Sequence, residues 1–119
     1  MASKLDISFL TPEQNEARKE FNIYAPHCFV YILRCAGGVL YTGISNNPIQ
    51  RFVNHCNGTG AKFTRSFPPK ELVFIQNYHF RADAAKIEYK IKQLTRQQKL
   101  EMIDANEPSI PDIFRLKRP

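Results

Sequence analysis

The sequence predicts a mixed α/β domain with a small three-stranded sheet that begins with a β-hairpin and is flanked by helices. Two runs of β-branched and aromatic residues surround Gly37-Gly38, and a third run covers residues 71–78. Segments with apolar residues at helical spacing lie before and after that third run. The chain has 119 residues, which suits one hydrophobic core and is too short for two full domains.

The first two strands are predicted over residues 28–34 and 39–44, which are rich in valine, isoleucine, leucine and tyrosine. Gly37-Gly38 between them can adopt the backbone conformations of a tight hairpin turn. The third strand, residues 71–78, contains the nearly continuous apolar stretch Leu72–Ile75. Such a stretch is typical of a strand in the middle of a sheet.

The chain is predicted to begin with an extension that carries a short helix. Thr11 is a suitable N-cap, Pro12 suits the first helical position, and Gln14 can complete a capping box. The helix is mostly polar and cannot anchor a core by itself. The expected division of the chain is an extension at 1–26, a main domain at 27–105 and a basic, proline-containing tail at 106–119.

A second helix is predicted to begin at Asn47, an N-cap that is followed by Pro48 and by Gln50, whose side chain could reach back to the cap. Arg51 and His55 lie four residues apart and therefore share one face of this helix. The apolar positions that form a buried helical stripe are Ile49, Phe52, Val53 and Cys56.

A loop punctuated by glycine and proline is predicted over residues 57–69, and a longer helix follows the third strand with Asp83 as its N-cap. Thr95 begins a further short helix. The apolar residues at helical spacing in the longer helix are Ala84, Ile87, Ile91 and Leu94.

The composition narrows the class of protein. Seventeen basic against 11 acidic residues give a net charge of +6 and a pI near 9.4, which favours a polyanionic partner but also serves solubility. No apolar run approaches the roughly 20 residues that span a bilayer, and Asp6 interrupts the N-terminus where a secretory signal would be apolar. A cytoplasmic protein with no membrane partner is expected.

The cysteines are odd in number and lack CxxC spacing, which indicates buried free thiols. They are Cys28, Cys35 and Cys56.

Two tyrosines on the predicted hairpin strands begin the strongest pattern in the sequence. Residues 30–32 contain Tyr31, and residues 41–43 begin with Tyr41. On these two tripeptides the sequence resembles the GIY-YIG nuclease family, whose name-giving tripeptides stand on its first two strands. Val30 and Thr42 depart from the family pattern.

The resemblance extends in order over residues 27–103 and rests on the combination, since a single tripeptide is common. A late asparagine that many members carry has no counterpart here, because Asn106 lies too far along the chain. The further matches are a helical R-x-x-x-H at Arg51 and His55, the GAK-x-TR loop of the small single-domain bacterial branch at residues 58–65, the metal-binding glutamate at Glu88, and that branch's IK-x-L-x-R-x-x-K ending at residues 91–99.

The resemblance implies a metal-dependent endonuclease that hydrolyses DNA phosphodiester bonds. It implies a role in DNA repair, with single-stranded, branched or damaged DNA as substrate and other repair proteins as partners. It also implies Mg²⁺ or Mn²⁺ bound at Glu88 and a structural role for Gly43. The catalytic residues that it implies are Tyr31, Tyr41, Arg51 and His55.

The chemistry of phosphodiester hydrolysis calls for the same residue types. A water must lose a proton, charge on the phosphoryl oxygens must be neutralised, and the leaving alkoxide must be stabilised. A metal on Glu88 serves the last two needs, and Arg51 offers a rigid charged fork for phosphate oxygens. A tyrosine acts as a base only where cations lower its pKa from about 10. Such a base requires Tyr31, Tyr41, Arg51 and His55 to converge.

Basic residues interleaved with aromatic ones indicate a surface for DNA phosphates and unpaired bases. Phe63 and Phe67 are the aromatic members. The same charges would also keep a protein soluble that binds no nucleic acid. The basic members are Lys62, Arg65, Lys92, Arg96 and Lys99.

Each assignment has a structural alternative. Tyrosines in strands are usually packing residues, Arg51 and His55 could form a solvated helix face, and Glu88 could pair with Lys92 four residues on. The whole chain could accordingly be a nucleic-acid-binding or protein-interaction module that keeps the fold with little catalytic activity.

Overall fold

The computed structural model, which describes residues 5–21 and 27–119, confirms the mixed α/β architecture. One antiparallel sheet has the strand order β2-β1-β3 and begins with the predicted hairpin. Gly37 and Gly38 both have positive φ in its turn, a conformation that favours glycine. The strands are β1 (Cys28–Cys35), β2 (Leu40–Ser45) and β3 (Pro69–Tyr78).

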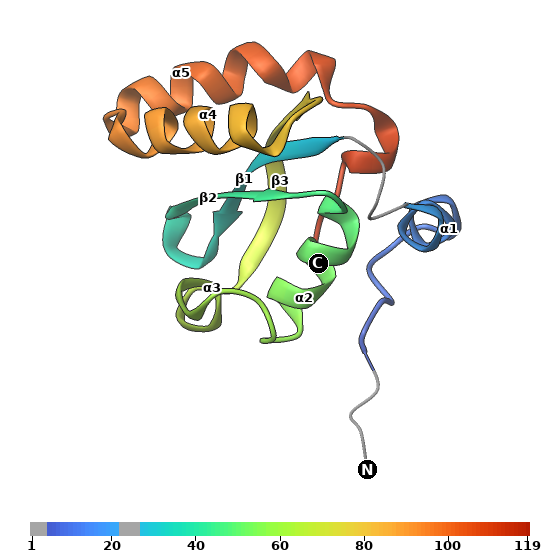
Figure 1. The fold of residues 1–119 in the computed structure, drawn as a ribbon. Coiled ribbons are helices and arrows are strands. Elements are labelled where there is room, and N and C mark those ends of the chain that lie inside the picture. Colours follow the sequence, from blue (N-terminus) through green and yellow to red (C-terminus); the bar gives the residue numbers. More distant parts are fainter. Residues whose placement is uncertain (1–4, 22–26) are drawn as a thin grey trace.

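Helices cover both faces of the sheet. In Figure 1, α4 and α5 lie on one face, while α2 and the C-terminal segment lie on the other. The helices are α1 (Pro12–Glu20), α2 (Pro48–Cys56), α3 (Lys62–Ser66), α4 (Arg81–Gln93) and α5 (Arg96–Asn106), followed by short 3₁₀ turns at Glu107–Ser109 and Asp112–Phe114.

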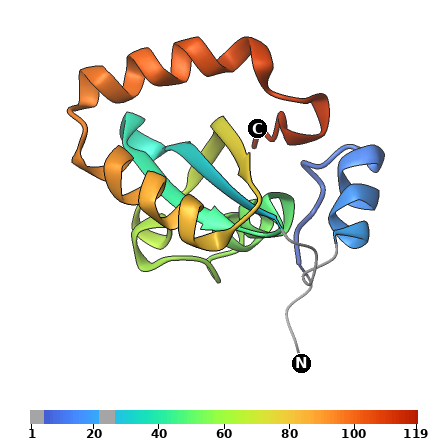
Figure 2. The ribbon, with the colours of Figure 1, turned by 45° about the horizontal axis from the view of Figure 1, so that its top comes forward.

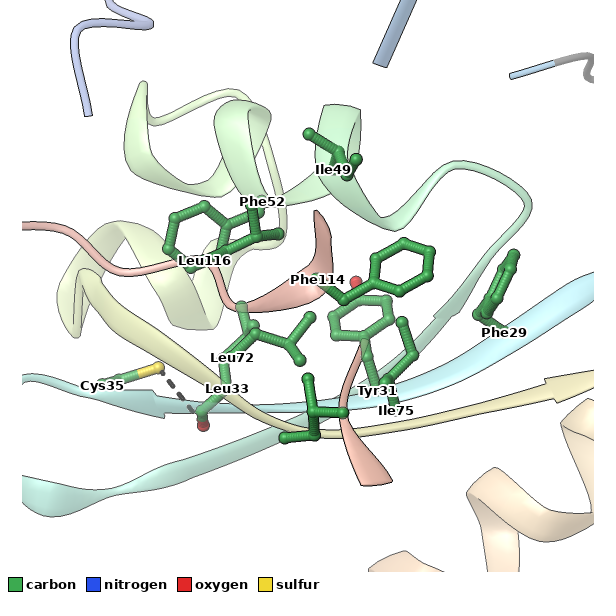
Figure 3. Close-up of a cluster of buried hydrophobic side chains, with 11 residues drawn as sticks. Phe29, Tyr31, Leu33, Cys35, Ile49, Phe52, Leu72, Ile75, Phe114 and Leu116 are labelled. Atoms are coloured by element: carbon green, nitrogen blue, oxygen red, sulfur yellow. Dashed lines mark hydrogen bonds between the residues drawn. The ribbon is translucent and has the colours of Figure 1, made fainter. Parts of the chain in front are cut away.

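Strand β1 is the centre of the domain, because its alternating side chains enter two separate cores. Tyr31 and Leu33 belong to the core shared with α2 and the C-terminal segment, where Figure 3 shows the Tyr31 ring rising from the strand. Val30 and Ile32 belong to the core beneath α4 and α5. Every β1 side chain except Arg34 is buried.

The prediction that the third strand lies in the middle of the sheet is wrong, since β3 is an edge strand and β1 is central. The apolar run of β3 has another cause, which is cover along its outer edge. The Leu72 amide donates to the Leu116 carbonyl at 2.9 Å, and the Arg118 amide donates to the Lys70 carbonyl at 2.7 Å. The C-terminal segment thereby shields an edge that would otherwise expose unpaired backbone groups.

The predicted helix starts at Thr11, Asn47 and Thr95 are confirmed. Both threonines form complete capping boxes, and Asn47 accepts a hydrogen bond from the Gln50 amide. The Gln50 side chain does not reach back to the cap, because its oxygen accepts a hydrogen bond from Arg18 of α1.

Two local predictions are wrong. Asp83 is not the N-cap of α4, which begins two residues earlier at Arg81 and leaves Asp83 in its first turn. The segment predicted as a loop over residues 57–69 contains the short helix α3. Its five residues, Lys62–Ser66, are too few for an apolar periodicity to be visible in the sequence.

The two terminal segments pack against each other, as Figure 2 shows for α1 and the C-terminus. Gln14 is buried, and its amide donates to the Arg115 carbonyl at 3.1 Å. The core on this face includes Phe114 and Leu116. Residues 106–119 are thus part of the packed body, while the division of the chain at residues 26/27 and 105/106 stays a prediction.

The expected free thiols are confirmed, with Cys28 and Cys35 buried and Cys56 partly buried. Among the described residues, no helix combines the length and apolar character needed to cross a bilayer.

Candidate active site

The hairpin brings the two tyrosines of the resemblance to neighbouring strands. Tyr31 on β1 stands opposite Gly43 on β2, and Tyr41 stands opposite Leu33 two pairs further along. Tyr31 is only 1% exposed, whereas Tyr41 is partly buried. A Cβ atom at Gly43 would lie 2.6 Å from the Tyr31 hydroxyl oxygen. A glycine at this position therefore leaves the space that the tyrosine hydroxyl occupies.

Helix α2 delivers His55 to the Tyr31 hydroxyl. The His55 Nε2 atom lies 2.9 Å from the Tyr31 oxygen, and His55 is 1% exposed. His55 is therefore not part of a solvated helix face. It is a buried polar side chain on the same helix as the apolar stripe, and burial of that kind requires hydrogen-bond partners.

The second partner of His55 comes from α3. The Thr64 hydroxyl oxygen lies 2.8 Å from His55 Nδ1, and Thr64 is itself buried. A Cβ atom at Gly60 would lie 2.2 Å from the same Nδ1. Sequence reasoning missed both residues. They stand in the GAK-x-TR loop at residues 58–65, whose basic side chains drew attention to DNA contacts instead.

Aromatic rings continue the site outward from His55. The Tyr41 ring meets the His55 ring edge-on with centroids 5.1 Å apart and stacks on Phe63 at 5.8 Å and 20°. Phe67 follows at 5.2 Å from Phe63. Phe63 and Phe67 are 39% and 40% exposed. The row thus runs from the buried histidine to solvent.

The pKa values of the buried pair move apart. Burial raises the pKa of Tyr31 to about 12, and the Tyr41 hydroxyl beside it acts in the same direction. The charge of Arg51 and a hydrogen bond from it act to lower this pKa but do not prevail. Burial, aided by Arg51, lowers the pKa of His55 to about 4. At neutral pH the tyrosine is therefore protonated and the imidazole is uncharged.

Glu88 of α4 lies close enough to the Tyr31 hydroxyl for its charge to act there, as does Arg51 of α2. Residues from β1, β2 and α2 thus meet at this hydroxyl, and Glu88 of α4 acts on it only through its charge. Their convergence does not produce the lowered tyrosine pKa that the sequence argument required, because burial outweighs the charge of Arg51.

Glu88 also makes the salt bridge that was its structural alternative. Its carboxylate lies 3.4 Å from the Lys92 ammonium, with 23% of the glutamate side chain exposed. No group of three or more histidine, cysteine, aspartate or glutamate side chains that could hold a metal occurs among the described residues. A lone carboxylate still fits Mg²⁺, because this ion keeps several waters and is bound by one or two carboxylates together with substrate phosphates.

The basic residues of the predicted DNA surface lie on two sides of the hairpin. Lys62 and Arg65 are exposed on α3 beside the aromatic row, and Lys92 is exposed on α4. Arg96 and Lys99 begin α5 and line a hollow with Val39 and Leu40 of the hairpin. Asn106 lies elsewhere, since its side-chain oxygen accepts a hydrogen bond from the Ile75 amide of β3 at 3.1 Å.

With this geometry in view, similarity to known proteins decides the family. Residues 27–101 match the family described as the GIY-YIG catalytic domain. The chain belongs to the GIY-YIG family. This family is one of nucleases that generally use divalent metals, although the match does not name a metal for this chain.

Relatives carry the name UPF0213 protein. One from Staphylococcus epidermidis is 49% identical over 75 residues, which is 63% of this chain and 92% of the relative. One from Desulfotalea psychrophila is 41% identical over 90 residues, which is 75% of this chain and 82% of the relative. A solution NMR structure of a UPF0213 protein from Bacillus halodurans is 33% identical, with a TM-score of 0.46, and covers 68% of this chain and 86% of that one.

Proposed function

We propose that this protein is a metal-dependent endonuclease that hydrolyses phosphodiester bonds in DNA. The observation that carries the proposal is the 2.9 Å contact between Tyr31 and His55, with the charges of Arg51 and Glu88 acting on the same hydroxyl. A tyrosine that only packs in a core is satisfied by one hydrogen-bond partner, whereas two charged side chains also act on this hydroxyl. Membership in a nuclease family supports the same conclusion.

The proton-transfer step is assigned to Tyr31 and His55. The Tyr31 oxygen accepts a proton from the attacking water while its own proton passes to His55 Nε2, so that hydroxide and an imidazolium result. Because burial raises the pKa of Tyr31 and lowers that of His55, complete transfer from the tyrosine to the imidazole is strongly unfavourable in the free protein. The resting pair therefore stays neutral, and the transfer takes place together with attack on the phosphate.

The negative charges of the phosphoryl oxygens and of the leaving alkoxide are assigned to Arg51 and Glu88. Arg51 holds a non-bridging phosphate oxygen through its guanidinium. Glu88 would hold Mg²⁺ or Mn²⁺, and a bound divalent ion supplies charge neutralisation at the phosphoryl group and stabilises the leaving alkoxide. Since the Lys92 ammonium pairs with this carboxylate in the free protein, Lys92 would have to move away for Glu88 to hold the ion.

The exposed aromatic row favours DNA with unpaired bases. Phe63 and Phe67 offer faces on which bases can stack, and stacking on such rings contributes about 1–3 kcal/mol per base. Lys62 and Arg65 flank these rings and suit the phosphates of the same strand. Single-stranded, branched or damaged DNA is the proposed substrate. A role in DNA repair, with other repair proteins as partners, extends this proposal.

A second candidate is a nucleic-acid-binding module with little catalytic activity. Two features favour it. The Glu88 carboxylate is paired with Lys92 and not free to bind a metal, and the raised pKa of Tyr31 makes it a poor base. The binding surface is the same in both proposals. Only the chemistry distinguishes them.

A cleavage assay separates the two candidates. Purified protein is incubated with labelled single-stranded, duplex and branched DNA in the presence of Mg²⁺, Mn²⁺ or EDTA, beside an Arg51→Ala variant. We expect cleavage of DNA with unpaired bases that requires the metal and falls about 10²–10³-fold in the variant. Binding without cleavage under all metal conditions would favour the second candidate.

A further inference from the structure

We infer that Thr64 is a positioning residue that determines which ring nitrogen of His55 carries the proton, so that Nε2 is free to accept the hydrogen bond of Tyr31. The inference rests on the proposed function for its catalytic meaning. Its structural content, the protonation pattern of a buried ring, stands by itself and can be measured without any cleavage.

The direction of each hydrogen bond follows from the donors that Thr64 and Ala61 possess. The Thr64 hydroxyl lies 2.9 Å from the carbonyl oxygen of Ala61, which can only accept. We assign the single hydroxyl proton to that carbonyl, which also accepts from the Thr64 amide at 3.1 Å. Towards His55 Nδ1, at 2.8 Å, the Thr64 oxygen can then act only as an acceptor. It follows that Nδ1 carries a proton.

An uncharged imidazole has one N–H, so a proton on Nδ1 leaves Nε2 as an acceptor. The Tyr31 hydroxyl, 2.9 Å away, then donates to Nε2. The result is a one-way chain from Tyr31 through His55 and Thr64 to the Ala61 carbonyl. It leaves the lone pairs of the Tyr31 oxygen available to Arg51 and to an incoming water.

One contact opposes this direction and is too long to prevail. The Ala61 amide lies 3.4 Å from His55 Nδ1 and would require that nitrogen to accept. Hydrogen bonds of this kind have their usual range at 2.7–3.2 Å, whereas the two contacts of Thr64 lie within that range. The shorter contacts therefore determine the proton position.

Two substitutions at Thr64 test the inference. Thr64→Val keeps the shape but removes the hydroxyl, and Thr64→Ser keeps the hydroxyl. Ile103→Val, in the core on the opposite face of the sheet, serves as a control for a modest loss of stability. The direct readout is the ¹⁵N NMR spectrum of protein with labelled histidine, in which protonated and bare ring nitrogens resonate in separate ranges. The His55 signals are assigned with a His55→Asn variant.

In the parent protein we expect the His55 proton on Nδ1. Thr64→Val should shift it towards Nε2 or mix the two tautomers, while Thr64→Ser and Ile103→Val should keep the parental pattern. Cleavage should fall about 10- to 100-fold in kcat for Thr64→Val, with KM nearly unchanged and recovery in Thr64→Ser. A proton on Nε2 in the parent protein would overturn the inference, as would an unchanged spectrum in a folded Thr64→Val variant. The spectra report the tautomer even if the parent protein does not cleave DNA. A failure of the proposed function is therefore distinguished from a failure of this inference.

Discussion

The polar groups of the site fall into two regions that differ in burial and in charge. Tyr31, His55 and Thr64 are buried, uncharged at neutral pH and joined by hydrogen bonds of 2.8–2.9 Å. Glu88 and Lys92 form a partly exposed ion pair at 3.4 Å on the surface of α4. The first region is held by the core as well as by its own bonds, whereas the second is held by little besides charge. Substitutions in the buried chain should therefore affect folding and chemistry together, and substitutions in the ion pair should affect chemistry alone.

The largest effect on stability is expected from pH, through the buried chain. The pKa of His55 is lowered from 6.5 to about 4 in the folded protein, so the unfolded chain binds a proton between these values that the folded protein does not bind. Uncharged His55 therefore contributes its full stabilisation of the folded protein above pH 6.5, and this stabilisation is lost as the pH falls towards 4. We expect this loss to reach about 3 kcal/mol.

Denaturant unfolding at a series of pH values measures this contribution. In His55→Asn, which cannot titrate, the acid limb of the stability curve should flatten by that amount. Equal acid limbs in the parent and variant proteins would mean that His55 is not held uncharged, and the contrast between the two regions would disappear.

Gly60→Ala should disrupt the buried chain through space alone. The added Cβ would lie 2.2 Å from His55 Nδ1, so the ring must move and the bonds to Tyr31 and Thr64 must break or lengthen. We expect a loss of about 1–3 kcal/mol in the free energy of unfolding, together with a fall in cleavage of at least about 100-fold.

Gly58→Ala is the matched control for that substitution. Gly58 has φ +77°, so alanine is strained there, but its Cβ would meet no atom within 4 Å. A loss of about 1–2 kcal/mol with parental cleavage is expected. Equal loss of activity in both variants would show that loop strain, and not displacement of His55, is responsible.

The ion pair should contribute little to folding. Lys92→Ala removes the partner of a carboxylate that remains in contact with solvent, and exposed pairs four residues apart on a helix contribute about 0.3–0.5 kcal/mol. Thermal melts should therefore change by less than about 1 kcal/mol in equivalent free energy. A loss comparable to that of the buried chain would assign Glu88 and Lys92 a structural role.

The smallest effects concern the basic surface. Lys62→Ala and Arg65→Ala should each reduce the slope of log binding constant against log salt by about one unit, without changing base preference. Lys19→Ala on α1, an exposed lysine on a different part of the surface, should leave the slope unchanged. Binding that is insensitive to salt in the parent protein would remove the proposed DNA contact.

Much of the fold could be predicted from interactions between residues close together in the sequence. The hairpin around Gly37-Gly38 and the caps at Thr11, Asn47 and Thr95 depend on residues close together in the chain, and all are confirmed. The edge position of β3 was not predictable in this way. The outer edge of β3 is covered by residues 116–118, more than 40 positions away in the sequence. The apolar run alone does not indicate whether a neighbouring strand or the C-terminal segment lies along that edge.

The site was predictable to a similar extent. Tyr31, Arg51 and Glu88 were predicted as site residues because their residue types and order resemble a family pattern, and their roles stay predictions. Thr64 and Gly60 were missed, because the value of a hydroxyl or of an absent side chain depends on which atom lies beside it. The direction of the Tyr31 pKa shift was missed for the same reason, since burial can be measured only in the fold.

The central claim is that the buried chain holds the site together while Glu88 serves the chemistry, and the Glu88→Gln variant tests it most directly. The substitution keeps the size of the side chain and removes its charge. Cleavage in Mg²⁺ or Mn²⁺ and thermal unfolding are measured on the same preparation. We predict that cleavage falls by about 10²–10³-fold or more, that DNA binding persists, and that the free energy of unfolding changes by less than about 1 kcal/mol. A destabilised Glu88→Gln protein that cuts DNA at the parental rate would contradict the account.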